Sequence, residues 1–131
     1  MYDKYNNGFW FSGSQPTGTG AQPAIGLMTP TGQERMFPVP VTPTALAAAP
    51  DGAVWFVENN SGAVARLDPN SGAVSSYVLP QYNGGSPGGI AVRSDGKVWI
   101  GSYSGTVFLL DPVAYDAQGW PHELPTSRLR R

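Results

Sequence analysis

The sequence predicts an all-β fold built from three blade-like repeats, and two recurring features support this. The first is an apolar strand centred on tryptophan, which returns at intervals of roughly 40 to 45 residues as Phe9-Trp10-Phe11, Val54-Trp55-Phe56 and Val98-Trp99-Ile100. The second is its setting: an Asx-Gly pair precedes each strand, and a second apolar run ending near a proline follows it, the pairs being Asn7-Gly8, Asp51-Gly52 and Asp95-Gly96. A repeat of this kind is typical of a β-propeller, in which each repeat forms one four-stranded antiparallel blade. We therefore predict a single domain of three blades, at about residues 1–42, 43–84 and 85–127.

Composition agrees with this fold class. The chain has 131 residues, with 17 Gly and 13 Pro and only 13% charged residues. Gly and Pro interrupt helices and mark the turns between short strands, and no segment shows a sustained helical spacing of apolar residues. The 40% apolar content can supply a core. The chain is therefore expected to be one turn-dense globular domain.

The first repeat differs most from the others. It begins with Met1 to Tyr5 where a first strand is expected, and its Ser12 to Pro23 stretch is rich in Gly, Thr, Ser and Gln. Such a stretch offers little apolar area to bury, so we predict a surface loop that tolerates shortening.

The second repeat predicts a four-stranded meander. Its strands are expected at Ala45 to Ala49, Ala53 to Glu58, Ala63 to Leu67 and Val74 to Leu79, with the tight turn Pro50-Asp51-Gly52 after the first. The run from Ala53 to Val57 is apolar on both faces, as expected for a sheet packed between two other sheets.

The third repeat follows the same order. Strands are expected at Gly89 to Val92, Lys97 to Gly101 and Thr106 to Leu110, with a longer turn at Val113 to Gln118 before an outer segment at Trp120 to Leu124. A two-sheet sandwich also has strands at such spacing. Sandwich strands have no reason to recur in register, however, so the repeated order favours the propeller.

Charge and residue usage exclude several function classes. The net charge of −1 and pI near 5.6 give no electrostatic reason to bind nucleic acid or an anionic membrane, and Arg128, Arg130 and Arg131 are expected to form a solvated tail. The chain has no cysteine, which excludes disulfides and thiol chemistry. Neither a signal-peptide core nor an apolar run of roughly 18 residues occurs. We expect a soluble protein of undetermined location, in a virion or in the cytoplasm.

Two segments carry a family resemblance. Residues 45–58, ALAAAPDGAVWFVE, continued by 62–69, GAVARLDP, resemble a blade of the streptogramin B (virginiamycin B) lyase family, and 86–92, SPGGIAV, through Trp99 resembles another. The resemblance covers residues 43–125 well and 5–42 loosely. It implies a seven-bladed propeller, so three blades are less than half a ring. Related blades serve propellers of unrelated function, so it indicates the architecture more than the activity.

The resemblance also implies where a lyase site would lie. The family opens the lactone of a cyclic depsipeptide by elimination, using a His that opens a blade, a Glu at the end of a Trp strand, and a magnesium ion. In the second repeat these positions hold Thr44 and Glu58, and in the third they hold Gly88 and Ser102. The general base is absent from both, so we expect no enzyme activity, with Glu58 as the one weak catalytic candidate and no cofactor unless Mg²⁺ serves a surviving lyase.

Other candidate sites are weaker. His122, the only histidine, lies in the outer segment and is expected at the surface, and no His-rich or carboxylate-rich spacing suggests a metal. Asp68 to Gly72 lacks the ligands of a calcium loop and is expected to be a turn. Tyr82, Tyr103 and Trp120 fall in turns or at the rim, where they could stack on a ligand such as a sugar.

The small number of blades predicts self-association. Closed propellers use about four to eight blades, and an open stack of three leaves an apolar face bare at each end. Two copies would close a six-bladed ring and three a nine-bladed one. Side chains alternate across a strand, so the junction joins either Trp99 to Phe9 and Phe11, or Trp10 to Val98 and Ile100. The sequence leaves both open.

Three functions are compatible with these sequence features. The leading one is a non-catalytic structural or binding module that assembles with itself and with other proteins, as in a virion or tail component. A lyase-like enzyme acting on cyclic depsipeptide lactones is the second, and a carbohydrate-binding propeller is the third.

Overall fold

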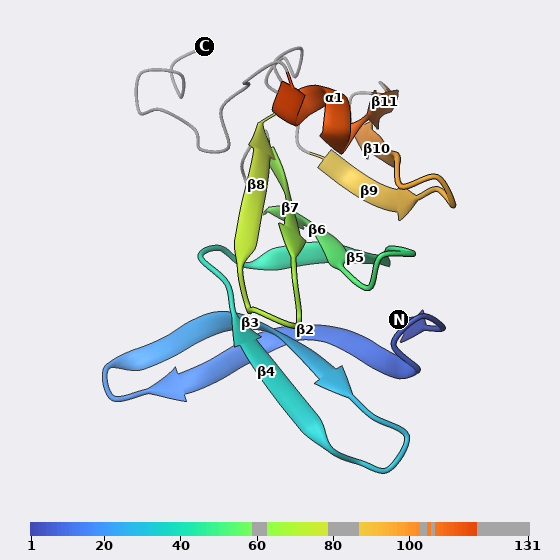
Figure 1. The fold of residues 1–131 in the computed structure, drawn as a ribbon. Helices are drawn as coiled ribbons and strands as arrows, with labels where there is room; N and C mark the ends of the chain where they lie inside the picture. The colour runs from blue at the N-terminus through green and yellow to red at the C-terminus, as the bar shows by residue number, and fades with distance from the viewer. Residues whose placement is uncertain (59–62, 79–86, 103–104, 106, 118–131) are drawn as a thin grey trace.

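Three antiparallel sheets are stacked in chain order in the computed structural model, which describes residues 1–58, 63–78, 87–102, 105 and 107–117 (Figure 1). The strand orders are β1-β2-β3-β4 in the first sheet, β5-β6-β7-β8 in the middle sheet and β11-β10-β9 in the third. Consecutive strands therefore pair with each other, as expected for blade-like meanders. Three separate sheets, predicted from the repeats, are confirmed over the described residues.

The strands follow the predicted repeats. The first sheet contains β1 (Tyr2–Asp3), β2 (Gly8–Thr17), β3 (Gly20–Met28) and β4 (Glu34–Pro38). The middle sheet contains β5 (Pro43–Ala48), β6 (Val54–Glu58), β7 (Ala63–Leu67) and β8 (Val74–Val78). The third contains β9 (Pro87–Val92), β10 (Val98–Ser102) and β11 (Val107–Leu110), followed by the helix α1 (Pro112–Ala117).

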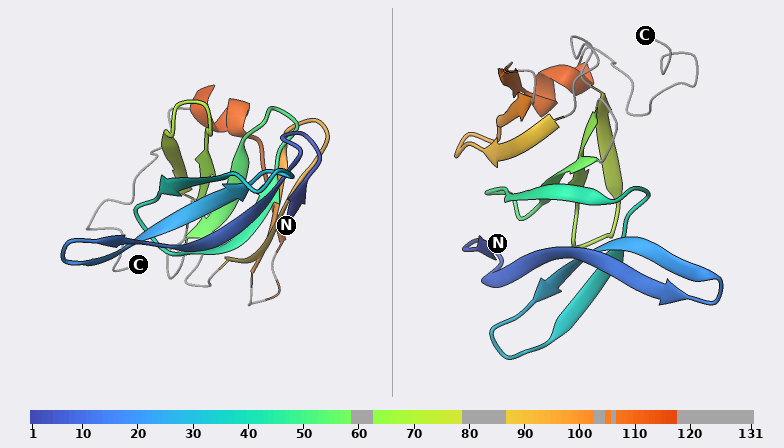
Figure 2. Two further views of the ribbon diagram at one scale, coloured as in Figure 1. Left: turned by 90° about the horizontal axis from the view of Figure 1, so that it is seen from below. Right: turned by 180° about the vertical axis from the view of Figure 1, so that it is seen from behind.

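Two hydrophobic clusters hold the stack together. Between the first and middle sheets, Trp10 packs in one cluster with Val54 and Phe56. Between the middle and third sheets, Trp55 packs in another with Val98 and Ile100. The middle sheet thus has a partner on each face, as the apolar run of β6 predicts, and the three layers can be followed from two more sides in Figure 2.

The predicted loop at Ser12 to Pro23 is wrong. These residues extend the hairpin of β2 and β3, with Ser12 paired to Ile25 and Thr17 paired to Gly20. Backbone pairing does not need apolar side chains, so a polar, Gly-rich composition did not exclude strands here. The Gln22 side chain also donates a 2.6 Å hydrogen bond to the Val39 carbonyl, which fixes the hairpin to the start of the next connection.

The first Asx turn is shifted by one residue from the predicted alignment. In the second and third repeats Gly52 and Gly96 adopt positive φ angles of 91° and 89°, and in the first repeat the positive φ, 49°, belongs to Asn7. Asn tolerates this left-handed conformation better than most residues. Asn7 therefore stands in the place of Gly52 and Gly96, and Gly8 begins strand β2.

The longer turn predicted at Val113 to Gln118 is replaced by the helix α1 as far as Ala117. The Asp111 carboxylate accepts hydrogen bonds from the backbone N–H groups of Val113 and Ala114, at 3.1 and 3.3 Å. An Asp cap followed by Pro at the first helical position is a recognised helix start, and it accounts for the helix here. Within the described ranges, no helix has the length and apolar character needed to span a membrane.

Candidate functional site

Thr44 and Glu58 lie at the same end of the middle sheet. They belong to paired strands, since Pro43 of β5 pairs with Glu58 of β6, and a register irregularity lies between Pro43 and Leu46. Thr44 is exposed and its hydroxyl donates a 3.5 Å hydrogen bond to the Val57 carbonyl. A Thr hydroxyl does not act as a general base near neutral pH, so this position supplies a weak hydrogen-bonding group only.

Glu58 is a buried carboxylate. Its side chain is on the face of β6 that carries Val54 and Phe56, and the residue is 6% exposed. Burial raises the pKa of Glu58 above its ordinary value, and a 3.2 Å hydrogen bond from the Ser76 hydroxyl opposes the rise only in part. A carboxyl group with a raised pKa is the type of group that transfers protons, so Glu58 is the described residue at the lyase-equivalent positions that best fits such a role.

A hollow of about 360 Å³ lies near Thr44. Thr44, Ala45 and Leu46 line it from β5, and Phe9, Phe11 and Ser12 from β2. Glu58 is not part of this lining. Thr44 and Glu58, the two residues at the lyase-equivalent positions, therefore do not both line this hollow.

The equivalent positions of the third repeat add no proton-transfer group. Gly88 is exposed in β9 and has no side chain, and Ser102 ends β10. Among the described residues, no three His, Cys, Asp or Glu side chains gather where they could hold a metal ion.

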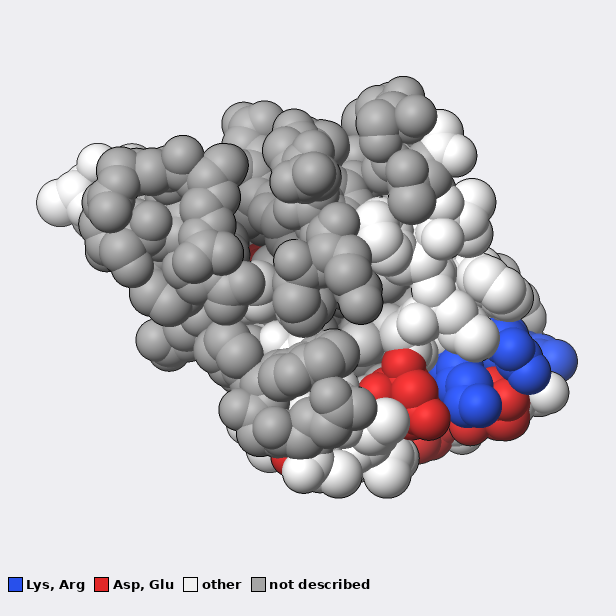
Figure 3. Space-filling view, turned by 90° about the horizontal axis from the view of Figure 1, so that it is seen from above, with Lys and Arg blue, Asp and Glu red and all other residues white. Residues whose placement is uncertain are grey.

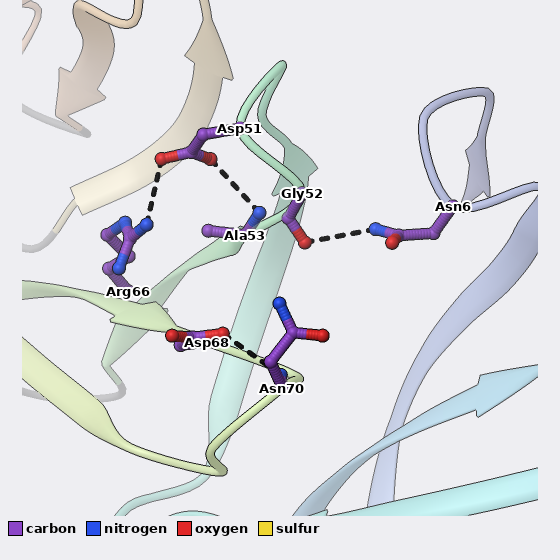
Figure 4. A network of polar contacts seen from close by, with 7 residues as sticks. All are labelled: Asn6, Asp51, Gly52, Ala53, Arg66, Asp68 and Asn70. Carbon is purple, nitrogen blue, oxygen red and sulfur yellow. Dashed lines mark hydrogen bonds and ion pairs between the residues drawn. The ribbon is translucent and has the colours of Figure 1, made fainter.

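A buried polar network at Asp3 was missed by the sequence analysis. Asp3 is fully buried, and its carboxylate accepts a 2.7 Å hydrogen bond from the Trp10 indole N–H. It also accepts from the Tyr5 backbone N–H and from both the backbone and the side-chain amide of Asn6. Burial favours a higher pKa for Asp3, but these hydrogen bonds together hold the pKa below its ordinary value. Asn6 also donates to the Gly52 carbonyl at 3.0 Å, which joins the turns of the first two repeats (Figure 4).

A cleft of about 680 Å³ separates the turn regions of the middle and third sheets. Its lining includes the aromatic rings of Trp55 and Tyr77 and the carboxylates of Asp51, Asp95, Asp111 and Asp116. Asp51 forms a 2.8 Å ion pair with Arg66 and accepts from the Ala53 backbone N–H, and both contacts are drawn in Figure 4. The Tyr115 ring of α1 packs in the adjoining hydrophobic cluster. Its hydroxyl accepts a hydrogen bond from the Val78 backbone N–H at 2.9 Å. The carboxylates of Asp51, Asp95 and Asp111 thus serve turns, ion pairs and a helix cap.

The residues predicted for a subunit junction divide into two groups. Trp10, Val98 and Ile100 are each fully buried inside the chain, within the two hydrophobic clusters. Phe9 and Trp99 are 51% and 42% exposed, and Phe11 is partly exposed. The sequence left two possible junctions open. The junction between Trp10 and the pair Val98 and Ile100 is wrong, because these three side chains already pack against neighbouring sheets of the same chain.

The exposed face of the third sheet also carries residues that the sequence analysis did not single out. Val107 and Leu109 are 64% and 43% exposed, and Leu109 pairs with Trp99 across β10 and β11. Alternation along β11 could have predicted this exposure, because Phe108 and Leu110 pack inward and Val107 and Leu109 must then point outward. Tyr82, Tyr103, Trp120 and His122 lie outside the described residues.

Comparisons with known proteins give the same architecture. A stretch of 35 residues, 27% of this chain and 12% of the relative, is 54% identical to the virginiamycin B lyase of Streptomyces coelicolor. A solved streptogramin B lyase matches with a TM-score of 0.59 and 24% identity, over 83% of this chain and 38% of that one. A catalytically inactive virginiamycin B lyase variant from Staphylococcus aureus with quinupristin matches with a TM-score of 0.52 and 22% identity, over 76% of this chain and 40% of that one. No family model matches the chain.

These likenesses confirm the resemblance to the lyase propellers at the level of the fold. The chain spans about two-fifths of the length of the solved lyases that it matches. A propeller fold serves many unrelated activities, so the activity has to be argued from the residues of this chain.

Proposed function

We propose that this chain is a non-catalytic β-propeller module that associates with further copies of itself to close a ring and presents the ring to partners in a larger assembly. One observation carries the proposal: each terminal sheet has an outward face with exposed aromatic side chains, Phe9 on the first sheet and Trp99 on the third. The corresponding face positions of the middle sheet are buried.

The energetic reason for association is the cost of leaving such faces in water. Burying a large apolar side chain contributes roughly 1.5 to 3 kcal/mol. Each outward face carries several partly exposed apolar side chains in neighbouring strands, so covering them together favours assembly. Closing a ring covers both faces with one kind of contact.

The non-catalytic part of the proposal rests on the chemistry at the lyase-equivalent end. Thr44 and Gly88 offer no side chain that accepts a proton near neutral pH. Glu58 is buried, hydrogen-bonded to Ser76, and absent from the lining of the nearby hollow. An elimination requires a base within hydrogen-bond reach of the substrate proton, and at these described positions only the buried Glu58 carboxyl could act as one.

The experiment is an assay of streptogramin ring opening with quinupristin, with and without Mg²⁺, together with the mass of the protein in solution. We expect no ring opening under either condition, and a mass equal to two or three chains of 13.9 kDa. Magnesium-dependent turnover that is lost in Glu58→Gln would establish the lyase alternative instead. A chain that stays monomeric at high concentration would remove the self-association.

A further inference from the structure

The two outward faces are formed by equivalent strands of the first and third sheets. The outward third-sheet face consists of Ala91, Trp99, Val107 and Leu109, which share one side of β9, β10 and β11 by pairing and alternation. The outward first-sheet face consists of Phe9, Phe11, Gly26 and Met28 on β2 and β3. Within the described part of the chain, neither face is covered by another sheet.

Both internal junctions of the chain use the same pair of faces. At the first junction the tryptophan side of the first sheet packs on the Val54 and Phe56 side of the middle sheet. At the second, the tryptophan side of the middle sheet packs on the Val98 and Ile100 side of the third. In each case a face centred on Trp meets a face made by the two residues that flank the next Trp.

The two outward faces are of the same two types as the faces that meet at each internal junction. Trp99 occupies the position of Trp10 and Trp55, so the outward third-sheet face is a Trp-centred face. Phe9 and Phe11 occupy the positions of Val54 and Phe56, so the outward first-sheet face is a face that receives a Trp. Met28 pairs with Phe9 as Leu67 pairs with Val54, which continues the apolar surface onto the next strand.

Two side-chain contacts indicate that these faces are suited to packing against another sheet rather than to contact with water. Leu109 pairs with Trp99, whereas at the equivalent position of the middle sheet Arg66 pairs with Trp55. On the first sheet, the Phe11 ring lies against Gly26 so closely that any Cβ there would overlap the ring, which makes a flat apolar surface. Viewed from the third-sheet end of the molecule, the visible charged side chains of the described residues gather mostly along one margin (Figure 3).

We infer that copies of this chain associate head to tail, with the outward third-sheet face of one copy packed on the outward first-sheet face of the next. The occupant of each face is therefore a second copy of the same chain, and the contact repeats the junction that the chain forms twice within itself. This inference rests on the proposed self-association and specifies its geometry. A contact between two Trp99 faces would have no counterpart among the internal junctions.

The test compares the solution masses of Trp99→Asp, Phe9→Asp and their equimolar mixture by analytical ultracentrifugation. Each variant alone should run as a monomer, because a charge that cannot be paired is placed in every junction. The mixture should recover a species of two chains, because the Trp99 face of one variant and the Phe9 face of the other are both unaltered. Val113→Asp is the matched control, since Val113 is 78% exposed on α1, outside both faces, and this variant should keep the wild-type mass.

The outcomes separate the geometry from the association itself. A monomeric wild type overturns the proposed self-association and the inference with it. An oligomeric wild type in which Trp99→Asp changes mass, Phe9→Asp does not, and mixing recovers nothing leaves the association intact but overturns the head-to-tail contact. An oligomer that neither substitution affects does the same.

Cysteine crosslinking tests the same contact without adding a charge. The chain has no cysteine of its own, so Val107→Cys and Met28→Cys each place a single thiol, on the equivalent strands β11 and β3 of the two faces. Under mild oxidation the head-to-tail contact gives a mixed disulfide when the two variants are combined, in yield at least several-fold above either variant alone. Crosslinking of Val107→Cys with itself, and none in the mixture, would overturn the inference.

Discussion

Trp55 in the middle sheet and Trp99 in the third sheet hold equivalent strand positions, yet Trp55 is 2% exposed and Trp99 is 42% exposed. The difference does not arise from the strands, since both tryptophans lie between apolar neighbours in a central strand of an antiparallel sheet. It arises because the Trp55 ring meets the third sheet, whereas no sheet of the described chain lies beyond Trp99. The same local sequence therefore builds a core in one place and an open surface in the other.

The largest expected difference between these sheets is in the free energy of unfolding. Trp55→Ala should lower it by about 3 to 5 kcal/mol, because the substitution leaves a large cavity in the cluster that joins two sheets. Trp99→Ala, the matched variant, should lower it by about 1 kcal/mol or less at protein concentrations where the chain is monomeric. Urea unfolding followed by circular dichroism measures both, and equal losses would show that the two positions do not differ as their burial indicates.

A second expectation concerns the carboxylates of the terminal sheets. Asp3→Ala should lower the free energy of unfolding by about 1 to 3 kcal/mol, because the buried Trp10 indole N–H loses its acceptor. The control is Asp95→Ala in the third sheet, where the carboxylate also accepts from a turn N–H but is exposed. Its loss should stay below about 1 kcal/mol. Thermal unfolding of the two variants side by side decides whether burial of the Asp3 network gives it the larger role.

The smallest expected effect is a pH dependence that contrasts Glu58 with Asp3. Burial raises the pKa of Glu58, so the folded state binds the Glu58 proton more tightly than the unfolded state does. As the pH rises above the ordinary pKa of a Glu side chain, ionisation of Glu58 therefore lowers the stability of the folded state. Glu58→Gln should therefore be more stable than the wild type at pH 7, by about 1 kcal/mol or less. This advantage should disappear below about pH 4.

Asp3 should show the opposite trend. Its pKa is lowered in the folded state, so its contribution is present at neutral pH and is lost as the pH falls through the folded-state pKa. Asp3→Asn should be less stable than the wild type at pH 7, and the difference should shrink in acid. Unfolding curves collected from pH 3 to 7 for both variants test the pair, and parallel curves would contradict the opposite signs.

Several features of the fold could be predicted from the residues alone. The Trp strands and their turns gave the number of sheets and the strand order, because alternation and turn chemistry act over a few residues. The resemblance of residues 43–125 to lyase blades gave the architecture that the solved lyases share with this chain. The same resemblance placed Thr44 and Glu58 together at one end of the middle sheet, where the structure has them.

Other features depended on contacts between distant residues. Ser12 to Thr17 pair with the strand that follows them, although their composition is typical of a loop. Asp68 and Asp111 both precede proline, and each carboxylate accepts a hydrogen bond from the backbone N–H two residues later. The segment after Asp68 ends as a turn at Gly72, which has a φ of 78°, whereas the segment after Asp111 continues into α1. There the Tyr115 ring packs at 5.1 Å from the Tyr77 ring of the middle sheet and helps to hold the helix. The burial of Asp3 likewise required the Trp10 indole to lie over the first turn.

The sequence by itself determined that each central strand has two apolar faces and that Trp99 must point opposite to Val98 and Ile100. The tertiary structure decided which of these faces is covered. Alternation along a strand fixes the relative directions of neighbouring side chains, but it has no reference to the sheets on either side. Only the stacking order, with Trp10 toward the middle sheet and Trp55 toward the third, supplies that reference. It leaves Trp99 and Phe9 at the two open ends of the stack.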